Sequence, residues 1–155
     1  MITSVEPWIE APLKRFVDEA GTVLALLLHP SGQVVAQHGW TRAVDVMSAC
    51  ALAAAIHASA GELGRQLEGR PFRGLHHAGR VRQLFLAEAR TASASYIFLT
   101  VFDAESSLGL VRMYFDELCA TLAASAPPPV STEPVLAMDF ERELNRNLAS
   151  LFGRA

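Results

Sequence analysis

The sequence has little of what marks several classes of protein. Its two cysteines in 155 residues, Cys50 and Cys119, are too few for the disulfide framework of a small secreted domain. The formal net charge of -3 lacks the basic excess of a nucleic-acid-binding protein. The most apolar run, residues 49–56, ends at His57, whereas a bilayer span needs about 20 residues. The first eight residues have no basic region before an apolar core, so we expect no signal peptide and a cytoplasmic location.

Motifs for catalysis and metal binding are also missing. No GxxxxGK[ST] or GxGxxG loop follows a strand-like segment, so we expect no nucleotide hydrolysis by this chain. His76 and His77 are adjacent on a predicted strand and would face opposite ways. His57 shares a helical face with Cys50, but two ligands make a poor zinc site. We therefore expect no catalytic residues, no metal site and no cofactor, and we expect both cysteines to pack as small hydrophobic side chains rather than form a disulfide.

The first helix is predicted over residues 8–20, where apolar residues recur at helical spacing. Pro12 falls inside this segment, and because proline fits best in a first turn, we expect the helix to start near Ala11. Gly21 is expected to end it.

Apolar runs between turn residues predict strands. Residues 22–29 are almost continuously apolar, as in a central strand, and the turn HPSG places Gly32 where a positive φ is needed. Residues 33–38 are more polar and are predicted to lie at a sheet edge. Three further strands are expected over residues 69–79, 80–89 and 94–103, the last of them central.

The strand-to-helix corner SSLGLVR raises a question, because glycine is a poor helix former. Ser106 or Ser107 can cap the helix that follows. We expect Gly109 to sit where a neighbouring backbone lies close, so that packing offsets its cost in the helix.

The order helix, two strands, long helix, three strands, helix predicts an α/β (α+β) fold. It consists of a five-stranded antiparallel sheet with helices on both faces. Residues 8–125 would form this domain, residues 126–135 a proline-rich linker, and residues 136–153 a C-terminal amphipathic helix.

The long helix, residues 42–67, is rich in alanine and apolar on more than one side. Such a helix needs covering on more than one side, and the hydrophobic content of 51% leaves room for a second buried surface. We therefore predict a homodimer. The expected interface residues are Ala51, Ala55, Ala58, Phe72 and Leu75.

Three segments carry a resemblance to a known family. SSLGLVRMYFDEL (residues 106–118) resembles the last strand-to-helix corner of bacterial MglB proteins, HAG (residues 77–79) the end of their third strand, and AAAIHASAGELGRQLEGRPF (residues 53–72) their long helix. These proteins belong to the Roadblock (dynein light chain) family. The element order of the chain is also similar to that of a Roadblock domain.

The resemblance implies a function. MglB-type proteins are partners of a small Ras-like GTPase and stimulate its GTP hydrolysis by repositioning its own residues, without an active site or an inserted arginine. We expect the exposed side of the long helix and the tail helix to contact such a GTPase. The residues chosen for these contacts are Arg42, Asp45, Ser48, Phe140, Leu144 and Leu148.

An arginine-rich segment adds a further candidate surface. Arg65, Arg70, Arg73, Arg80 and Arg82 fall close together with only Glu68 opposing them. This is either a solvated patch or a surface that recognises an acidic partner, in which case Arg65 and Arg73 are the chosen contacts.

Two alternatives stay open. One is a Roadblock adaptor that bridges proteins in a polarity or motility complex without affecting GTP. The other is a sensory domain of the PAS or GAF kind, which would need a ligand cavity.

Overall fold

The computed structural model describes residues 6–39, 45–128 and 133–152 and, in the last of these segments, the side chains of residues 142–151. Five strands form one antiparallel sheet in the order β2-β1-β5-β4-β3. This confirms the predicted fold class. The elements, in chain order, are α1 (Pro7–Ala20), β1 (Leu24–Leu28), β2 (Val34–Gly39), α2 (Val46–Glu68), β3 (Gly74–Ala78), β4 (Gln83–Arg90), β5 (Ser95–Phe102), α3 (Leu108–Ser125) and α4 (Glu133–Phe152).

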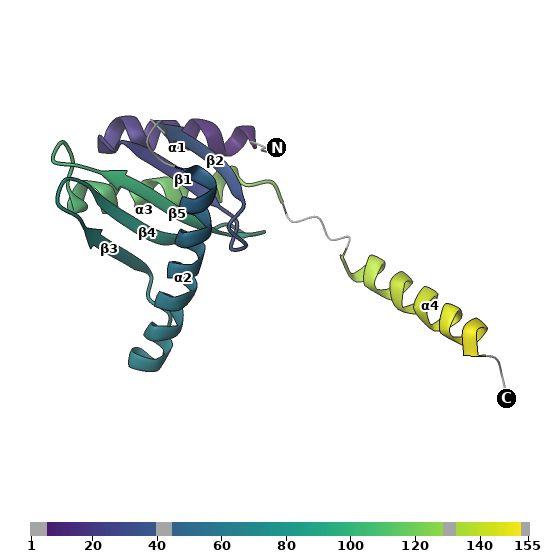
Figure 1. The fold of residues 1–155 in the computed structure, drawn as a ribbon. Helices are drawn as coiled ribbons and strands as arrows, with labels where there is room; N and C mark the ends of the chain where they lie inside the picture. The colour runs from purple at the N-terminus through teal and green to yellow at the C-terminus, as the bar shows by residue number, and fades with distance from the viewer. Residues whose placement is uncertain (1–5, 40–44, 129–132, 153–155) are drawn as a thin grey trace.

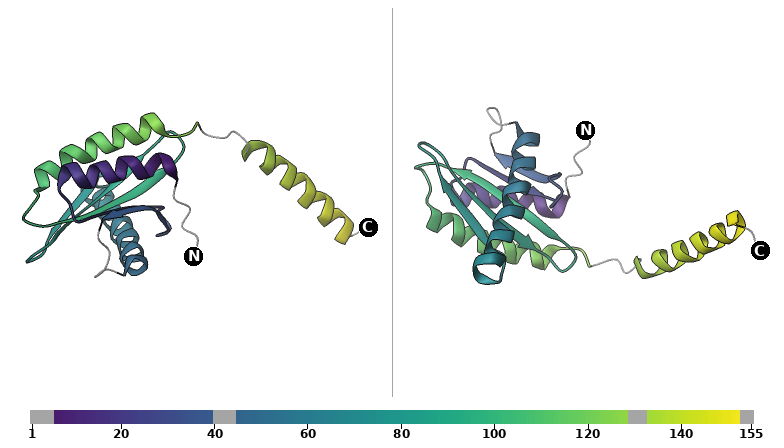
Figure 2. Two further views of the ribbon diagram at one scale, coloured as in Figure 1. Left: turned by 90° about the horizontal axis from the view of Figure 1, so that it is seen from above. Right: turned by 60° about the horizontal axis from the view of Figure 1, so that its bottom comes forward.

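The domain has three layers (Figure 1). Helices α1 and α3 lie side by side on one face of the sheet, and α2 crosses the other face and extends past its edge (Figure 2, left). Strands β1 and β5 are central and β2 is an edge strand, as the sequence predicted. Strand β3 forms the opposite edge and pairs only with β4.

The face of the sheet toward α1 and α3 is filled by aromatic side chains. The Phe98 ring lies 4.9 Å from that of Phe16 in α1 and 5.0 Å from that of Phe115 in α3, measured between ring centroids. Phe85 meets Phe115 at 5.4 Å. A cavity between the two helices, lined in part by Phe16 and Tyr114, has a volume of about 10 Å³, which leaves space for one water at most. A sensory domain would need a much larger cavity at such a place.

The start of α1 differs from the prediction. The helix begins at Pro7 and continues through Pro12. Pro7 occupies the first turn, where its fixed φ and missing N–H cost nothing. The hydrogen bond that Pro12 cannot make is outweighed by packing, since Ile9 and Leu13 on either side of it are buried in the core. Gly21 ends the helix at φ 68°, as predicted.

The corner before α3 also departs from the expectation. Ser107 caps the helix by accepting a hydrogen bond from the Leu110 amide at 3.2 Å, which confirms one of the two predicted caps. Gly109, however, is exposed, and a Cβ added there would meet only the Ser107 hydroxyl at 4.0 Å. The expected close backbone is not there, so Gly109 leaves a small open patch of surface instead of allowing tight packing.

Helix α4 stands apart from the sheet and its helices in each view (Figures 1 and 2). Its Leu144, Leu148 and Leu151 side chains are exposed and share one helical face, because they are spaced by four and three residues.

Candidate interaction surface

Helix α2 has well-defined ends. Asp45 caps the start: its carboxylate accepts hydrogen bonds from the Ser48 amide at 3.3 Å and from the Ser48 hydroxyl at 2.9 Å. These bonds lower the pKa of Asp45, the hydroxyl bond having the largest effect. Gly69 ends the helix with φ 75°, and its amide donates to the Arg65 carbonyl at 2.9 Å. Both ends are therefore fixed by local hydrogen bonds.

The sheet covers one side of α2. Cys50, Ala53 and Gly64 are its buried residues, and Cys50 and Ala53 pack on an apolar cluster of the sheet that includes Leu26 and Leu86. Burial raises the pKa of the Cys50 thiol, so this group stays protonated and acts as a small hydrophobic side chain. The prediction for Cys50 is confirmed.

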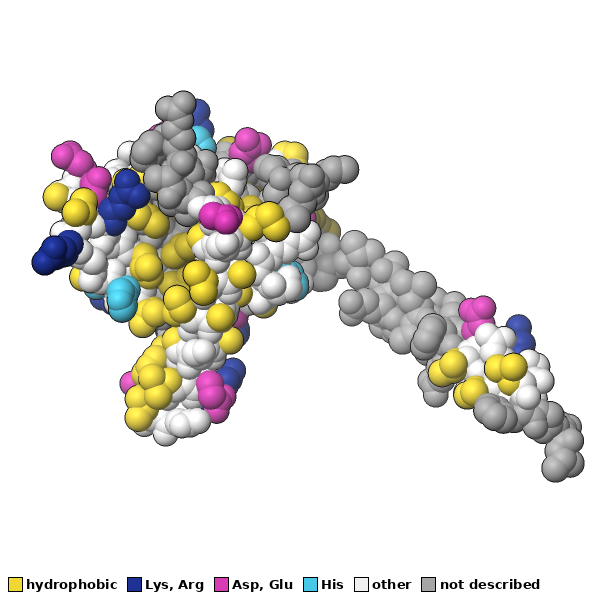
Figure 3. Space-filling model, in the orientation of Figure 1, with side chains coloured by type: hydrophobic (Ala, Val, Ile, Leu, Met, Phe, Trp, Pro, Cys, Tyr) yellow, Lys and Arg dark blue, Asp and Glu magenta, His cyan; other side chains and the backbone are white. Residues whose placement is uncertain are grey.

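A second side of α2 carries large apolar residues that no described part of the chain covers. We call this the leucine stripe: Leu52, Ile56, Leu63 and Leu67. Their exposed fractions are 64%, 42%, 51% and 68%, and their spacing of four, seven and four residues places them along one line of the helix. Figure 3 shows apolar side chains along α2 and over the adjoining sheet. This stripe was not predicted from the sequence, although its spacing is visible there.

The alanines chosen from the sequence lie elsewhere on α2. Ala51, Ala55 and Ala58 are all exposed. Each is two or five residues from Ala53, so by the helical period they point away from the sheet. They present a low ridge, next to the larger side chains of the leucine stripe.

The composition of α2 has a second consequence. An 18-residue window of the helix has a mean hydropathy of 1.4, and its length would suffice to cross a membrane. Only 11% of that window is buried. Helices of proteins that do not span a membrane can reach the same length and mean hydropathy, so these two properties are weak evidence for a membrane span. It shows that the helix carries more apolar surface than its own domain covers.

Gly64 fixes the path of the chain between α2 and β3. A Cβ at this position would lie 2.5 Å from the Phe72 amide nitrogen and 2.7 Å from the Arg70 carbonyl oxygen. The returning segment therefore passes directly against the helix, which only glycine permits. Phe72 and Leu75, two of the predicted interface residues, are half-buried beside the leucine stripe's helix as a result. This role of Gly64 was not predicted from the sequence.

The remaining predicted contacts are spread over the molecule. Arg65 pairs with Glu62 at 3.1 Å on the exposed surface, and Arg73 is exposed just before β3. Leu144 and Leu148 lie on α4, away from these residues. Arg42 and the side chain of Phe140 fall outside the described residues.

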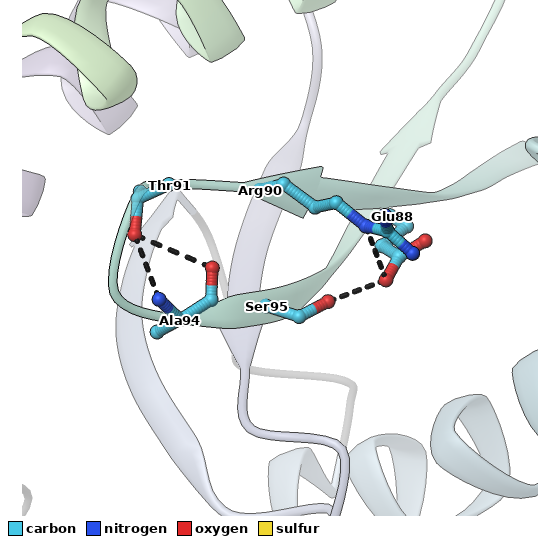
Figure 4. Close-up of polar contacts among 5 residues, drawn as sticks. All are labelled: Glu88, Arg90, Thr91, Ala94 and Ser95. Atoms are coloured by element: carbon cyan, nitrogen blue, oxygen red, sulfur yellow. Dashed lines mark hydrogen bonds and ion pairs between the residues drawn. The ribbon is translucent and has the colours of Figure 1, made fainter.

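A small polar network closes the β4–β5 hairpin (Figure 4). Glu88 accepts hydrogen bonds from the Ser95 hydroxyl and from Arg90, whose Nε is 3.1 Å away. Burial opposes ionisation of Glu88, but these bonds and the nearby charges of Arg90 and His57 outweigh it and lower its pKa. The Thr91 hydroxyl accepts from the Ala94 amide at 3.1 Å and orders the turn. The network orders the hairpin.

The described residues offer little for chemistry. No group of three or more His, Cys, Asp or Glu side chains within them could hold a metal ion. Cys119 is half-buried, and burial together with Asp116 raises its pKa to about 11, so it is a poor nucleophile at neutral pH.

The fold is similar to that of several proteins of known structure. No protein-family model matches the chain, and no curated protein matches it by sequence. Among solved structures, Myxococcus xanthus MglB is similar with 25% identity and a TM-score of 0.69, over 76% of this chain and 94% of that protein. A structure described as MglB with tetrameric arrangement matches with 24% identity and a TM-score of 0.66, over 75% of this chain and 85% of the other.

A third match comes from a different source. A Roadblock/LC7 domain from Streptomyces avermitilis has 20% identity and a TM-score of 0.61, over 77% of this chain and 95% of that domain. These matches cover nearly the whole of each relative. The chain therefore has a Roadblock fold of the MglB type.

Proposed function

We propose that the protein is a homodimeric regulator of a small Ras-like GTPase, acting in the cytoplasm without an active site of its own. The observation that carries this proposal is the exposed leucine stripe on α2, beside the half-buried Phe72 and Leu75. A surface helix with four large apolar residues in line is expected to be covered by another protein.

The free energy gained by burying the leucine stripe is small compared with the cost of association, so we expect the interface to include further residues. Covering a half-exposed leucine contributes about 1 kcal/mol, so the stripes of two copies would contribute about 8 kcal/mol. Association itself costs about 4–15 kcal/mol. The stripe alone therefore barely suffices. The proposed interface adds Ala51, Ala55 and Ala58, which let the two α2 helices approach closely, and the edge strand β3, whose outer backbone groups are open for pairing with a second copy.

Oligomeric assembly is known for the fold. One of the similar structures is an MglB with a tetrameric arrangement. A dimer through α2 and β3 would leave α1 and α3 outside and could form the unit of a larger assembly.

The partnership with a GTPase rests on the resemblance to MglB-type proteins. In this proposal the exposed start of α2, with Asp45 and Ser48, contacts the GTPase. Arg42, which lies outside the described residues, is proposed as a further contact. Arg65 and Arg73 would recognise acidic groups on it. Because Asp45 and Ser48 already bond to each other, their contribution would come from a fixed orientation.

The tail helix is proposed to add contacts. Leu144 and Leu148 are 45% and 42% exposed on one face of α4, together with Leu151 at 77%. An amphipathic helix with such a face fits an apolar groove of a partner. Phe140 completes the predicted face.

The regulation would act by ordering groups that the GTPase already has. A dimer offers a rigid surface, and a rigid surface can hold a mobile loop of its partner in the reactive arrangement. No inserted arginine is required.

The test is GTP turnover by the Ras-like GTPases of the source organism, measured with and without this protein. Faster turnover supports the proposal. A stable complex with unchanged turnover would favour the adaptor function, and no complex with any of these GTPases would contradict the partnership.

Variants of α4 separate its role. We expect Leu144→Asp with Leu148→Asp, or deletion of residues 130–155, to weaken the complex. The matched control, Asn145→Asp with Ala149→Asp, adds the same charge about 100° further around the helix, outside the leucine face, and should bind normally. Full affinity of the truncated chain would remove α4 from the interface.

A further inference from the structure

Four arginines stand at the two ends of one edge strand. Arg70 and Arg73 precede β3, and Arg80 and Arg82 lie in the loop that joins β3 to β4. All four are exposed. Within the described part of the chain none of them forms an ion pair, whereas the nearby Arg65 is paired with Glu62.

The backbone holds these positions firmly. The Gly79 amide donates to the Arg82 carbonyl at 2.8 Å, which closes the β3–β4 loop tightly, with Arg80 at its tip and Arg82 directly before β4. At the other end, Gly64 lets residues 70–72 pass against α2. The two arginine pairs are therefore set on fixed segments, about 20 Å apart along an extended chain.

The homodimer proposed above would bring these pairs together. In an antiparallel pairing of two β3 strands about their central residue His76, the beginning of one strand lies beside the end of the other. Arg73 of one copy then lies next to Gly79 of the second copy, at the strand spacing of about 4.8 Å, and Arg80 of that copy follows directly in its loop. Arg82 faces Gly79 across the same tight turn and so lies one strand further from the junction, and Arg70 extends beyond Arg73 at the same end. Each end of the paired strands would carry four guanidinium groups from two chains.

Four like charges in so small a space oppose the pairing. They also form a good receptor for a compact anion with several negative charges, because the planar guanidinium group binds phosphate oxygens in pairs. We propose that each end of the β3–β3 junction binds a diphosphate-type anion, which bridges the two copies and strengthens the dimer. This inference rests on the proposed function, specifically on its homodimer.

The experiment is sedimentation velocity of the full chain over a range of concentrations. It is run in sodium chloride and in sodium pyrophosphate at matched ionic strength. At a pyrophosphate concentration ten times its dissociation constant, we expect dimerisation to tighten about tenfold for each bound anion. Arg73→Gln with Arg80→Gln should remove this response, and Arg70→Gln with Arg82→Gln serves as a second pair if the first fails to fold.

Two exposed arginines elsewhere, Arg15 in α1 and Arg112 in α3, give the control. The variant Arg15→Gln with Arg112→Gln should respond to pyrophosphate as the wild type does. Equal dimerisation of the wild type in both salts would overturn the anion site and leave the homodimer standing. A second result would also overturn the anion site and leave the homodimer standing. In it, the Arg73→Gln with Arg80→Gln variant dimerises more tightly than the wild type in both salts, and the wild type does not respond to pyrophosphate. The arginines would then only oppose strand pairing. A chain that stays monomeric in every condition would contradict the homodimer and the anion site together.

Discussion

The two faces of the sheet are built differently. Toward α1 and α3, aromatic side chains such as Phe98 and Phe115 meet ring to ring and are almost fully buried. Toward α2, the sheet is covered by a helix whose contact side is made of Cys50, Ala53 and Gly64 and whose neighbouring side leaves leucines exposed. The apolar side chains on the first face are buried within one chain. On the second face, apolar side chains of α2 remain exposed, and we propose that this surface contacts other proteins.

The largest loss of stability is expected on the face of the sheet that α1 and α3 cover. Phe98 is fully buried between Phe16 and Phe115, so Phe98→Ala should reduce the free energy of unfolding by about 3–5 kcal/mol. Chemical denaturation measures this. Leu63→Ala on the leucine stripe, assayed at a concentration where the chain is monomeric, should change it by less than about 0.5 kcal/mol. Equal losses for both variants would show that the two faces do not differ as described.

An intermediate effect is expected where α2 meets the returning chain. Gly64→Ala places a Cβ against the backbone of residues 70–72, and backbone cannot move aside cheaply. We expect a loss of about 1–3 kcal/mol in the free energy of unfolding. Gly61→Ala, in the same helix with only the Pro71 side chain at 3.9 Å, is the matched control and should be neutral or stabilising. A neutral Gly64→Ala would mean that the segment before β3 is loosely held.

A small effect of opposite sign is expected at the corner before α3. Since Gly109 faces open space, Gly109→Ala removes backbone entropy from the unfolded chain without a clash. The helix should gain about 0.5 kcal/mol. A rise in the thermal midpoint of unfolding would support this gain. A clear fall would indicate that a neighbouring backbone packs against Gly109, as the sequence predicted.

The smallest expected effect concerns pH. The folded protein holds the pKa of Glu88 below its ordinary value of 4.5, so this carboxylate contributes stability above that pH and loses the contribution as the pH falls through the lowered value. The stability gap between the wild type and Glu88→Gln should therefore shrink between pH 6 and pH 3. Glu117→Gln, an exposed position on α3, is the control, and a gap that does not change with pH would contradict the role of the hairpin network.

Much of this fold could be read from the sequence because its signals are local. Turn glycines such as Gly21 and Gly32 have the expected positive φ, Ser107 caps α3, and the continuous apolar run of β1 marks a central strand. The start of α1 could not be read in this way. The burial of Ile9 and Leu13 overrides the usual effect of Pro12, and that burial depends on segments distant in sequence.

The candidate surface was predicted only in part. The sequence pointed to α2 as a helix in need of a partner, but its many alanines made every side look equally apolar. The side against the sheet and the leucine stripe became distinct only once the position of the sheet was known. Gly64 was missed for the same reason, since its neighbours Phe72 and Arg70 return to it after the helix has ended.

The most direct test of the central claim is the oligomeric state of the full chain with the leucine stripe altered. Sedimentation velocity should show a dimer for the wild type and a folded monomer for Leu52→Asp with Leu63→Asp. The control variant, Leu110→Asp with Met113→Asp, adds the same charges to exposed apolar positions on α3 and should remain dimeric. A wild type that is monomeric at high concentration, or a stripe variant that dimerises as well as the wild type, would contradict the account.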